Sequence, residues 1–311
     1  MRIFITGATG YIGGAVAQRL LTAGHQVIGL ARSNQSADRL KAMGAEVHRG
    51  DLGDLDSLTR GAAAAEGVVH AGFSVGDWSQ LDSAFAQEQA AVEAMLSTLA
   101  GTGQPLLYTS GSGVLTDTGA AIADETVPAN GAGAVALRAA LEQTVLQAGK
   151  HGVRTIVIRP GLVYGQGGSG VMHMLAELAR QAGGGRTVGD GHNVWSAVHV
   201  DDLADLYLSG LERGPAGTLF NAATEEEVTM REIVSSIAHT LHLPGSPTAW
   251  PVEEARGPLG PLADGLASNK RISAARARRI LGWRPHRAGL IEEIERGSYP
   301  AAFGIASGQN A

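Results

Sequence analysis

A glycine-rich stretch near the start of the sequence has the residue types and spacing of a phosphate-binding turn. The stretch reads TGATGYIGG, with Gly7, Gly10 and Gly13 directly after a predicted strand and at the opening of a predicted helix. Glycines at these places let the backbone turn tightly and let N–H groups at the helix N-terminus approach a pyrophosphate. In this strand–turn–helix context the motif predicts dinucleotide binding. A merely tight turn would require a fold that has lost its ligand.

The end of the second predicted strand carries the charge that separates NADP from NAD. The sequence there reads VIGLARSNQ, which places Arg32 and Ser33 after the strand and no acid before Asp38. An acid at this point would bind the adenosine ribose hydroxyls and repel a 2′-phosphate, whereas an arginine accepts that phosphate. The residues therefore favour NADP, with NAD as the less favoured cofactor. The alternative is that Arg32 is a solvated charge or stacks on adenine in either cofactor.

The bulk composition limits the classes of protein to which the sequence can belong. The 311 residues are 44% hydrophobic and 17% charged, which is enough for a large core in one big domain or two unequal ones. A net charge of -6 without a basic stripe argues against nucleic acid and membrane surfaces as partners. The chain has no cysteine, no signal-peptide pattern in MRIFIT and no apolar run of membrane-spanning length. We therefore expect a cytoplasmic protein.

Short apolar segments alternate with longer amphipathic ones, and these elements must position the chemistry. Strands are predicted at RIFITG, QVIGLAR, AEVHRGD, GVVHAGF, PLLYTSG, RTIVIRPG and GTLFNAA, with helices between them that include residues 79–100 and 131–149. Runs rich in valine, isoleucine and leucine are typical of strands buried on both faces, and helical crossovers are what parallel strands require. The sequence therefore predicts an α/β fold, a Rossmann-type doubly wound parallel sheet.

The regular alternation loosens after residue 165. Glycine-rich stretches surround a predicted helix near 171–182, and a proline-rich connection, LPGSPTAWPVEEARGPLGPLADG, follows later. We expect a nucleotide-binding core over 1–165, with returning segments at about 195–223. The remaining segments, 166–194 and 224–311, are expected to form a smaller C-terminal cap that binds the substrate.

A series of motifs runs through nearly the whole chain in a characteristic order. They are GxxGxxG at 7–13, GDL at 50–52, HAGF at 70–73, RPGLVYG at 159–165, VHVDDLADLYL at 198–208, LFNAA at 219–223 and SNKRISAARARRILGWRP at 268–285. In that order the chain resembles the extended short-chain dehydrogenase/reductase superfamily, in its NAD-dependent epimerase/dehydratase-like branch. The resemblance implies an NAD(P)-dependent enzyme with a small-molecule substrate, and a homodimer through the two long helices. The cofactor-binding residues that it implies, together with those named above, are Gly7, Thr9, Gly10, Tyr11, Ile12, Gly13, Arg32, Ser33, Asp51, Leu52, Ala71, Gly72, Phe73, Arg138, Pro160 and Val163.

The predicted helix at 131–149 departs from this family where its catalyst is expected. The family carries a Tyr and a Lys four residues apart, commonly with a Glu four residues further on. Counting back from Glu142 places Arg138 at the Lys position and Ala134 at the Tyr position. Arg138 could still hold the nicotinamide ribose or a developing oxyanion, but a guanidinium is a poor acid or base. The usual proton donor is therefore missing.

Two further positions depart from the family, which makes the chain an atypical member. In YTSGSGVLTD the expected serine falls on Gly111, between Ser110 and Ser112, and the asparagine expected on the preceding helix aligns with Glu88. Without a positioned acid, reduction of a carbonyl typically loses about 10²- to 10⁴-fold in rate. Another hydroxyl could deliver the proton, and the nearest candidates are Ser110, Ser112 and Tyr164. Tyr164 also fits a packing role in the VYG turn.

Six other residues attract attention but have a structural interpretation that is at least as good. Aromatic residues in the loops could line the pocket or anchor the loops. A histidine followed by two acids looks like a metal or acid/base cluster but matches a structural segment of the family. No metal site is therefore predicted. These residues are Trp78, His173, Trp195, His199, Asp201 and Asp202.

Three functions remain open. The leading one is an NADP-dependent oxidoreductase that reduces a small carbonyl or imine compound by a non-standard proton route. A nucleotide-sugar epimerase or dehydratase is disfavoured, because it would also need the Tyr and Lys and because the cap offers few cations for a diphosphate, mainly Arg180, Arg186 and Arg256. The third is a non-catalytic sensor that binds NADP(H).

Overall fold

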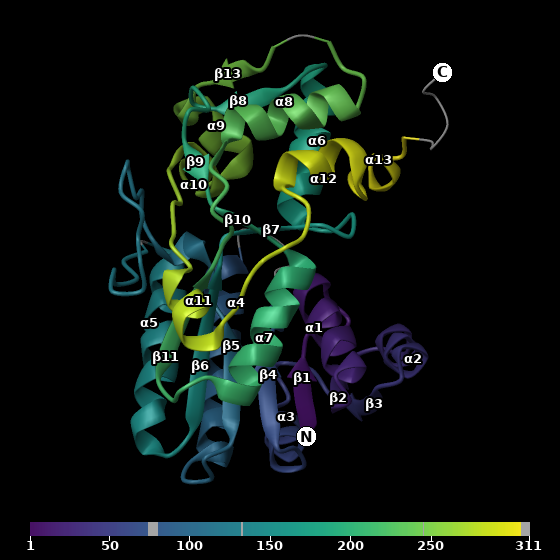
Figure 1. The fold of residues 1–311 in the computed structure, drawn as a ribbon, viewed down its shortest axis with the longest axis vertical. Helices are drawn as coiled ribbons and strands as arrows, with labels where there is room; N and C mark the ends of the chain where they lie inside the picture. The colour runs from purple at the N-terminus through teal and green to yellow at the C-terminus, as the bar shows by residue number, and fades with distance from the viewer. Residues whose placement is uncertain (74–79, 132, 245, 306–311) are drawn as a thin grey trace.

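The computed structural model describes residues 1–73, 80–131, 133–244 and 246–305, and it describes no side chain at residue 134. Trp78 lies outside these residues. A seven-stranded parallel sheet runs through the lower part of the molecule in the order β11-β6-β5-β4-β1-β2-β3 (Figure 1). Its strands are β1 (Arg2–Thr6), β2 (Gln26–Ala31), β3 (Glu46–Arg49), β4 (Gly67–His70), β5 (Pro105–Thr109), β6 (Arg154–Pro160) and β11 (Thr218–Ala222).

The sheet confirms the predicted Rossmann-type fold. The inner strands β4 and β5 are buried at every position, as their continuous apolar sequence requires. The strand order reverses between β1 and β4, where the chain leaves on opposite faces of the sheet. In such sheets the ligand crevice lies outside the carboxyl ends of the strands at this point.

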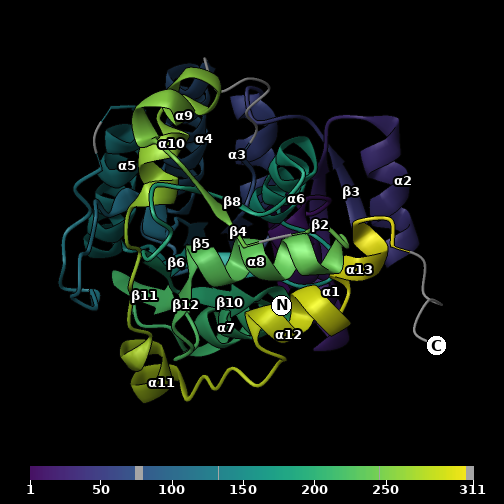
Figure 2. The same cartoon turned by 90° about the horizontal axis from the view of Figure 1, so that it is seen from above.

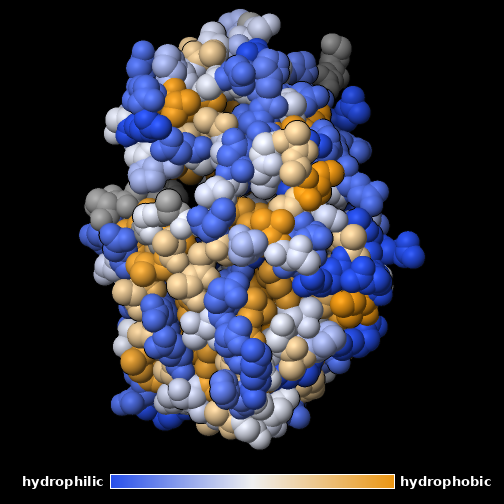
Figure 3. All heavy atoms as spheres, turned by 90° about the vertical axis from the view of Figure 1, so that its left-hand side faces the viewer, coloured by the Kyte–Doolittle hydropathy of each residue, from blue (hydrophilic) through white to orange (hydrophobic). Residues whose placement is uncertain are grey.

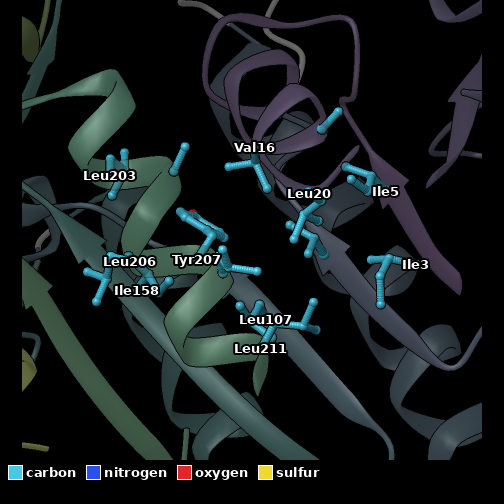
Figure 4. Packing of buried hydrophobic residues seen from close by; sticks show 14 of the residues in the cluster. Ile3, Ile5, Val16, Leu20, Leu107, Ile158, Leu203, Leu206, Tyr207 and Leu211 are labelled. Carbon is cyan, nitrogen blue, oxygen red and sulfur yellow. The ribbon is translucent and has the colours of Figure 1, made fainter. Parts of the chain in front are cut away.

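Helices cover both faces of the sheet. One layer contains α1 (Tyr11–Thr22), α2 (Asn34–Met43), α7 (Val200–Arg213) and α11 (Ala275–Leu281), and the other contains α3 (Leu55–Ala63), α4 (Leu81–Leu99) and α5 (Ala134–Ala148). Figure 4 shows the first layer, where the ring of Tyr207 on α7 lies among aliphatic side chains of α1, α7 and the strands. The labelled neighbours are Ile3, Ile5, Val16, Leu20, Leu107, Ile158, Leu203, Leu206 and Leu211.

A second group of elements, called here the upper lobe, lies above the carboxyl ends of the strands (Figures 1 and 2). It has its own apolar core, which includes Trp250 and Tyr299. Figure 3 shows a hollow between the upper lobe and the sheet-bearing part. The upper lobe comprises α6 (Gly170–Ala182), β8 (Arg186–Val188), β9 (Val194–Trp195), β12 (Val228–Thr229), α8 (Met230–Thr240), β13 (Thr248–Trp250), α9 (Val252–Leu259), α10 (Leu262–Ala267), α12 (Leu290–Arg296) and α13 (Tyr299–Ala302).

Short elements connect the two parts. β7 (Leu162–Tyr164) pairs with β10 (Ala197–His199), and the 3₁₀ turn η2 (Ser112–Val114) follows β5. A second 3₁₀ turn, η3 (Gly149–His151), lies between α5 and β6 within the sheet-bearing part. The predicted proline-rich connection contains β13, α9 and α10. Its prolines permit the two short helices because Pro251 and Pro261 stand just before them and Pro258 lies near the end of α9. Among the described helices, none combines the length and apolar character that a bilayer span requires.

Candidate cofactor and active site

The turn between β1 and α1 is built by glycines that stand against neighbouring backbone. Gly7 has a φ of 75°, and a Cβ there would lie 2.6 Å from the carbonyl oxygen of Ala71. A Cβ on Gly13 would lie 2.2 Å from the carbonyl oxygen of Gly7. α1 starts after Gly10, with no side chain capping its N-terminus and no acid in its first turn. The free N–H groups and the positive end of the helix therefore fit the phosphates of a dinucleotide.

A cavity of about 620 Å³ opens beside this turn. Its lining comes from the segments that follow β1, β2, β3 and β4, and from α2 and α4. The predicted cofactor residues that it brings together are Gly7, Thr9, Gly10, Arg32, Ser33, Asp51, Leu52, Gly72 and Phe73. Six further lining residues were not predicted from the sequence: Leu30, Gln35, Ser36, Arg39, Gly50 and Gln87.

The part of the cavity beyond β2 is lined by cations and hydroxyls. Arg32 and Arg39 both line it, and Ser33 caps α2 by accepting the N–H of Ser36 at 3.1 Å. The first turn of α2 carries no acid. Asp51 is the one carboxylate among the lining residues, and its Oδ1 accepts the N–H of Gly53 at 2.7 Å. This arrangement favours an anionic group. Ser36 and Arg39 lie three residues apart on α2 and therefore on the same face of the helix. This spacing could have identified both as cavity-lining residues from the sequence.

Five other predicted cofactor residues, Tyr11, Ile12, Ala71, Pro160 and Val163, do not line this cavity. The Tyr11 hydroxyl donates to the carbonyl of Gly165 at 2.8 Å, and burial raises the pKa of Tyr11 well above its ordinary value. Ile12 follows it in the first turn of α1, and Ala71 follows β4. Pro160 ends β6, and Val163 lies in β7. Tyr11 therefore ties the phosphate-binding turn to the segment that leads into the upper lobe.

The two serines after β5 have different surroundings. The Ser110 hydroxyl donates to Glu142 Oε2 at 2.7 Å, and Arg159 Nε donates to the same oxygen at 3.1 Å. The side chains of Glu142 and Arg159 are fully buried. No residue in the described ranges forms a hydrogen bond with the hydroxyl of Ser112, which begins η2. Of the two, Ser112 is the hydroxyl that keeps its capacity for a ligand.

The Arg138 side chain reaches α4 and the end of β5. Its Nη2 donates to the carbonyl of Thr109 at 3.0 Å and lies 3.5 Å from Glu88 Oε1. Its guanidinium carbon lies 4.9 Å from the ring centroid of Phe73 and 5.9 Å from that of Phe85. Arg138 and Glu88, at the two positions where the family carries Lys and Asn, therefore form an ion pair with each other.

A buried histidine joins this group. His70 is 1% exposed, its Nδ1 lies 2.9 Å from Thr6 Oγ1, and its Nε2 lies 3.8 Å from Glu88 Oε1. Burial, aided by the positive charge of Arg138, lowers the pKa of His70 to about 3. Burial raises the pKa of Glu88, although Arg138 and the Tyr108 hydroxyl oppose this shift. His70 is therefore held neutral behind the cofactor cavity.

Tyr164 lies in a packed environment. Its hydroxyl donates to the carbonyl of Ala288 at 2.8 Å, and its ring meets that of His199 edge-on. Burial raises the pKa of Tyr164, which makes it a weaker acid. His199 Nδ1 accepts the N–H of Asp201 at 3.2 Å and so caps α7. These contacts favour the packing interpretation of both side chains.

One group of described residues could gather around a cation. Asp202, Asp205 and His286 offer ligand atoms within 4.8 Å of one another. The Asp202 carboxylate already accepts the N–H groups of His286 and Arg287, each at 3.1 Å, and Asp205 forms an ion pair with Arg19. These partners explain the cluster as a brace between α7 and the segment that leads to α12.

The three arginines considered as candidates for binding a diphosphate have partners within the upper lobe. Arg180 donates to the carbonyl of Phe303 at 2.6 Å. Arg186 lies 4.0 Å from the ring centroid of Trp250, and Arg256 forms ion pairs with Glu253 and Asp264. Two aromatic candidates are also bonded, His173 to the carbonyl of Gly167 at 2.8 Å and Trp195 to that of Ser268 at 2.9 Å. All five side chains therefore make the contacts of structural anchors.

Comparison with known proteins gives one family match and several similar chains. The model of the NAD dependent epimerase/dehydratase family matches residues 3–223. An uncharacterized protein of Saccharomyces cerevisiae is 35% identical over 297 residues, which cover 94% of this chain and 98% of that protein. The 2-alkyl-3-oxoalkanoate reductase of Stenotrophomonas maltophilia is 29% identical, over 92% of this chain and 95% of the reductase. The structure of Thermus thermophilus UDP-glucose 4-epimerase in complex with NAD shares the fold, with a TM-score of 0.79 at 22% identity over 98% of this chain and 100% of that chain.

The glycine contacts predict opposite effects for two adjacent helix positions. Gly13→Ala should lower the free energy of unfolding by about 1–3 kcal/mol and abolish NADPH binding, because the added carbon would overlap the backbone of Gly7. Gly14→Ala is the matched control, since the nearest atom to its added carbon lies 3.5 Å away. It should be neutral or stabilising by up to about 1 kcal/mol. Urea unfolding and NADPH fluorescence measure both effects, and equal losses for the two variants would contradict the steric argument.

The low pKa of His70 predicts a loss of stability in mild acid. In the unfolded chain His70 binds a proton with its ordinary pKa of about 6.5. In the folded chain its pKa is about 3, so His70 stays neutral down to that pH. The unfolded state therefore binds more protons between these values, and stability falls as the pH falls. Between pH 7 and pH 5 the His70 contribution should cost about 2 kcal/mol, and His70→Asn should remove this part of the slope.

Urea unfolding at both pH values measures that slope. His151→Asn, at an exposed position, is the control and should leave the slope unchanged. A slope that is the same in the parent chain and in His70→Asn would contradict the assignment.

Proposed function

The chain belongs to the NAD dependent epimerase/dehydratase family, and from this premise we propose that it is an NADP-dependent oxidoreductase that reduces a small carbonyl or imine compound. The observation that carries the cofactor assignment is the lining beyond β2, where Arg32 and Arg39 stand with Ser33 and Ser36. Two cations, two hydroxyls and a helix N-terminus suit the 2′-phosphate that distinguishes NADP from NAD. An acid that would bind a free ribose hydroxyl is not present in the first turn of α2.

The reaction that we propose needs one hydride and one proton. Bound NADPH would supply the hydride to the carbonyl or imine carbon. The chain must then place a proton on the oxygen or nitrogen of the substrate. Ser112 is the candidate group, because its hydroxyl has no partner in the described residues and because Ser110 is bonded to Glu142. Arg138 cannot serve as the acid, since a guanidinium stays protonated.

The upper lobe completes the proposal. We assign residues 1–165 and about 195–223 to cofactor binding, and residues 166–194 and 224–311 to substrate binding, because the upper lobe lies above the carboxyl ends of the strands (Figure 1). A homodimer through α4 and α5 and a cytoplasmic location are also part of this proposal. Since Arg180, Arg186 and Arg256 already have internal partners, a small substrate fits this lobe better than a sugar diphosphate.

A second candidate, a non-catalytic NADP(H) sensor, is favoured by one observation. The sequence carries alanine at position 134, where the family places its proton donor, and α5 begins at that residue. Such a protein would keep the cofactor cavity and lose turnover. Activity against a panel of substrates therefore separates the two candidates.

The cofactor assignment predicts a selective loss of NADPH binding. Arg32→Ala and Arg39→Ala should each weaken NADPH binding by about 10-fold or more and leave NADH binding within about twofold, because only NADPH carries a 2′-phosphate on its adenosine ribose. Arg60→Ala, on the exposed surface of α3, is the matched control and should change neither. Fluorescence titration measures both affinities. Equal loss of NADPH and NADH binding would contradict the assignment of NADP as the cofactor.

The proton route predicts a difference between the two serines. Ser112→Ala should lower kcat by about 10²- to 10⁴-fold for the best of a panel of ketones, aldehydes and imines, with NADPH affinity unchanged. Ser110→Ala is the comparison, and its main effect should be on stability through the loss of the bond to Glu142. NADPH absorbance measures turnover. Tight NADPH binding without turnover of any substrate would instead support the sensor, and conversion of a nucleotide sugar without a net absorbance change would support an epimerase.

A further inference from the structure

The contacts of Arg138 lie on the side of α4 and the ends of β4 and β5. They include the carbonyl of Thr109, the carboxylate of Glu88 and the rings of Phe73 and Phe85. The guanidinium also interacts with the Tyr108 hydroxyl on β5. Arg138 is not among the residues that line the cofactor cavity, whereas Phe73 is. The contacts therefore connect Arg138 to the cavity through Phe73.

Glu88 fixes the guanidinium in this orientation. The side chain of Glu88 is 1% exposed, and a carboxylate buried to that extent requires a cation or a proton. Glu88 and Phe85 lie three residues apart on α4, so they project from the same face of the helix. One face of α4 thus presents a carboxylate and an aromatic ring to the same guanidinium.

Phe73 is the element that this cluster shares with the cavity. Its ring centroid lies 5.0 Å from that of Phe85, with an angle of 27° between the planes, and 4.9 Å from the Arg138 guanidinium. A cation near the ring face and a stacked ring fix the orientation of an aromatic side chain. The cluster is therefore built to hold Phe73 in one position at the cavity wall.

We propose that Arg138 and Glu88 are positioning residues that hold Phe73 against the bound dinucleotide, so that Arg138 serves the cofactor indirectly. This inference rests on the proposed cofactor site. It assigns Arg138 a different task from direct contact with the nicotinamide ribose. A planar guanidinium is required, because an ammonium on a flexible stem does not stack on Phe73 while bonding Thr109 and Glu88 in the same way.

A double-mutant cycle on the full chain tests the indirect route. Phe73→Leu and Arg138→Met should each weaken NADPH binding, measured by fluorescence titration, by about 10-fold. The double variant should bind NADPH within about twofold of the weaker single variant, because Arg138 acts through Phe73. Losses that multiply to about 100-fold would overturn the proposal, since they would mean that Arg138 contacts the cofactor by itself.

Arg138→Lys separates positioning from charge pairing. It keeps a cation opposite Glu88, so its urea unfolding midpoint should stay close to that of the parent chain, while its NADPH affinity should fall nearly as far as in Arg138→Met. Full recovery of NADPH affinity in Arg138→Lys would overturn the requirement for a stacked guanidinium. A parent chain that binds neither NADPH nor NADH would overturn this inference together with the proposed function, and multiplicative losses would overturn this inference alone.

Discussion

The close contact between the turn after β1 and the end of β4 is the constraint on which the site depends. Gly7 and Gly13 leave no room for a side-chain carbon between the turn, α1 and Ala71. Because β1 and β4 are neighbours where the strand order reverses, this contact brings the open N-terminus of α1 and the segments after β2 and β4 around one cavity. A looser turn would separate these segments, and each alone is too small to bind a dinucleotide. Packing alone therefore requires glycine at these two positions, whether or not a phosphate is bound.

Two buried carboxylates, Glu88 on α4 and Glu142 on α5, have arginine partners inside the molecule. Glu142 receives hydrogen bonds from Arg159 and Ser110, and Glu88 faces Arg138. A buried ion without its partner is strongly unfavourable, so a Glu or an Arg placed alone in this layer would destabilise the fold. The fold tolerates the buried carboxylate of Glu88 because it forms an ion pair with Arg138. The ion pair therefore gives Arg138 of α5 a structural partner on α4.

The features that can be predicted from the sequence are those that depend on residues close together along the chain. The sheet, its helices and the glycine turn follow from apolar runs and from residues a few positions apart, and Arg32 follows from its place after β2. The pairing of Glu88 with Arg138 spans 50 residues, and no periodicity signals it. The difference between Ser110 and Ser112 depends on Glu142 in another element. The upper lobe is harder still, because β8 and β13 are three-residue strands that exist only through their pairing with each other.

The partners of the cations in the upper lobe bear on the kind of substrate. Arg180, Arg186 and Arg256 each have a carbonyl, a ring or a carboxylate as partner. A diphosphate would have to replace these partners, and each replacement would subtract from its binding free energy. The small carbonyl or imine compound proposed above carries no diphosphate and would leave these partners in place. In the proposed function, electrostatic selectivity would therefore lie beyond β2, at Arg32 and Arg39, and would serve the cofactor more than the substrate.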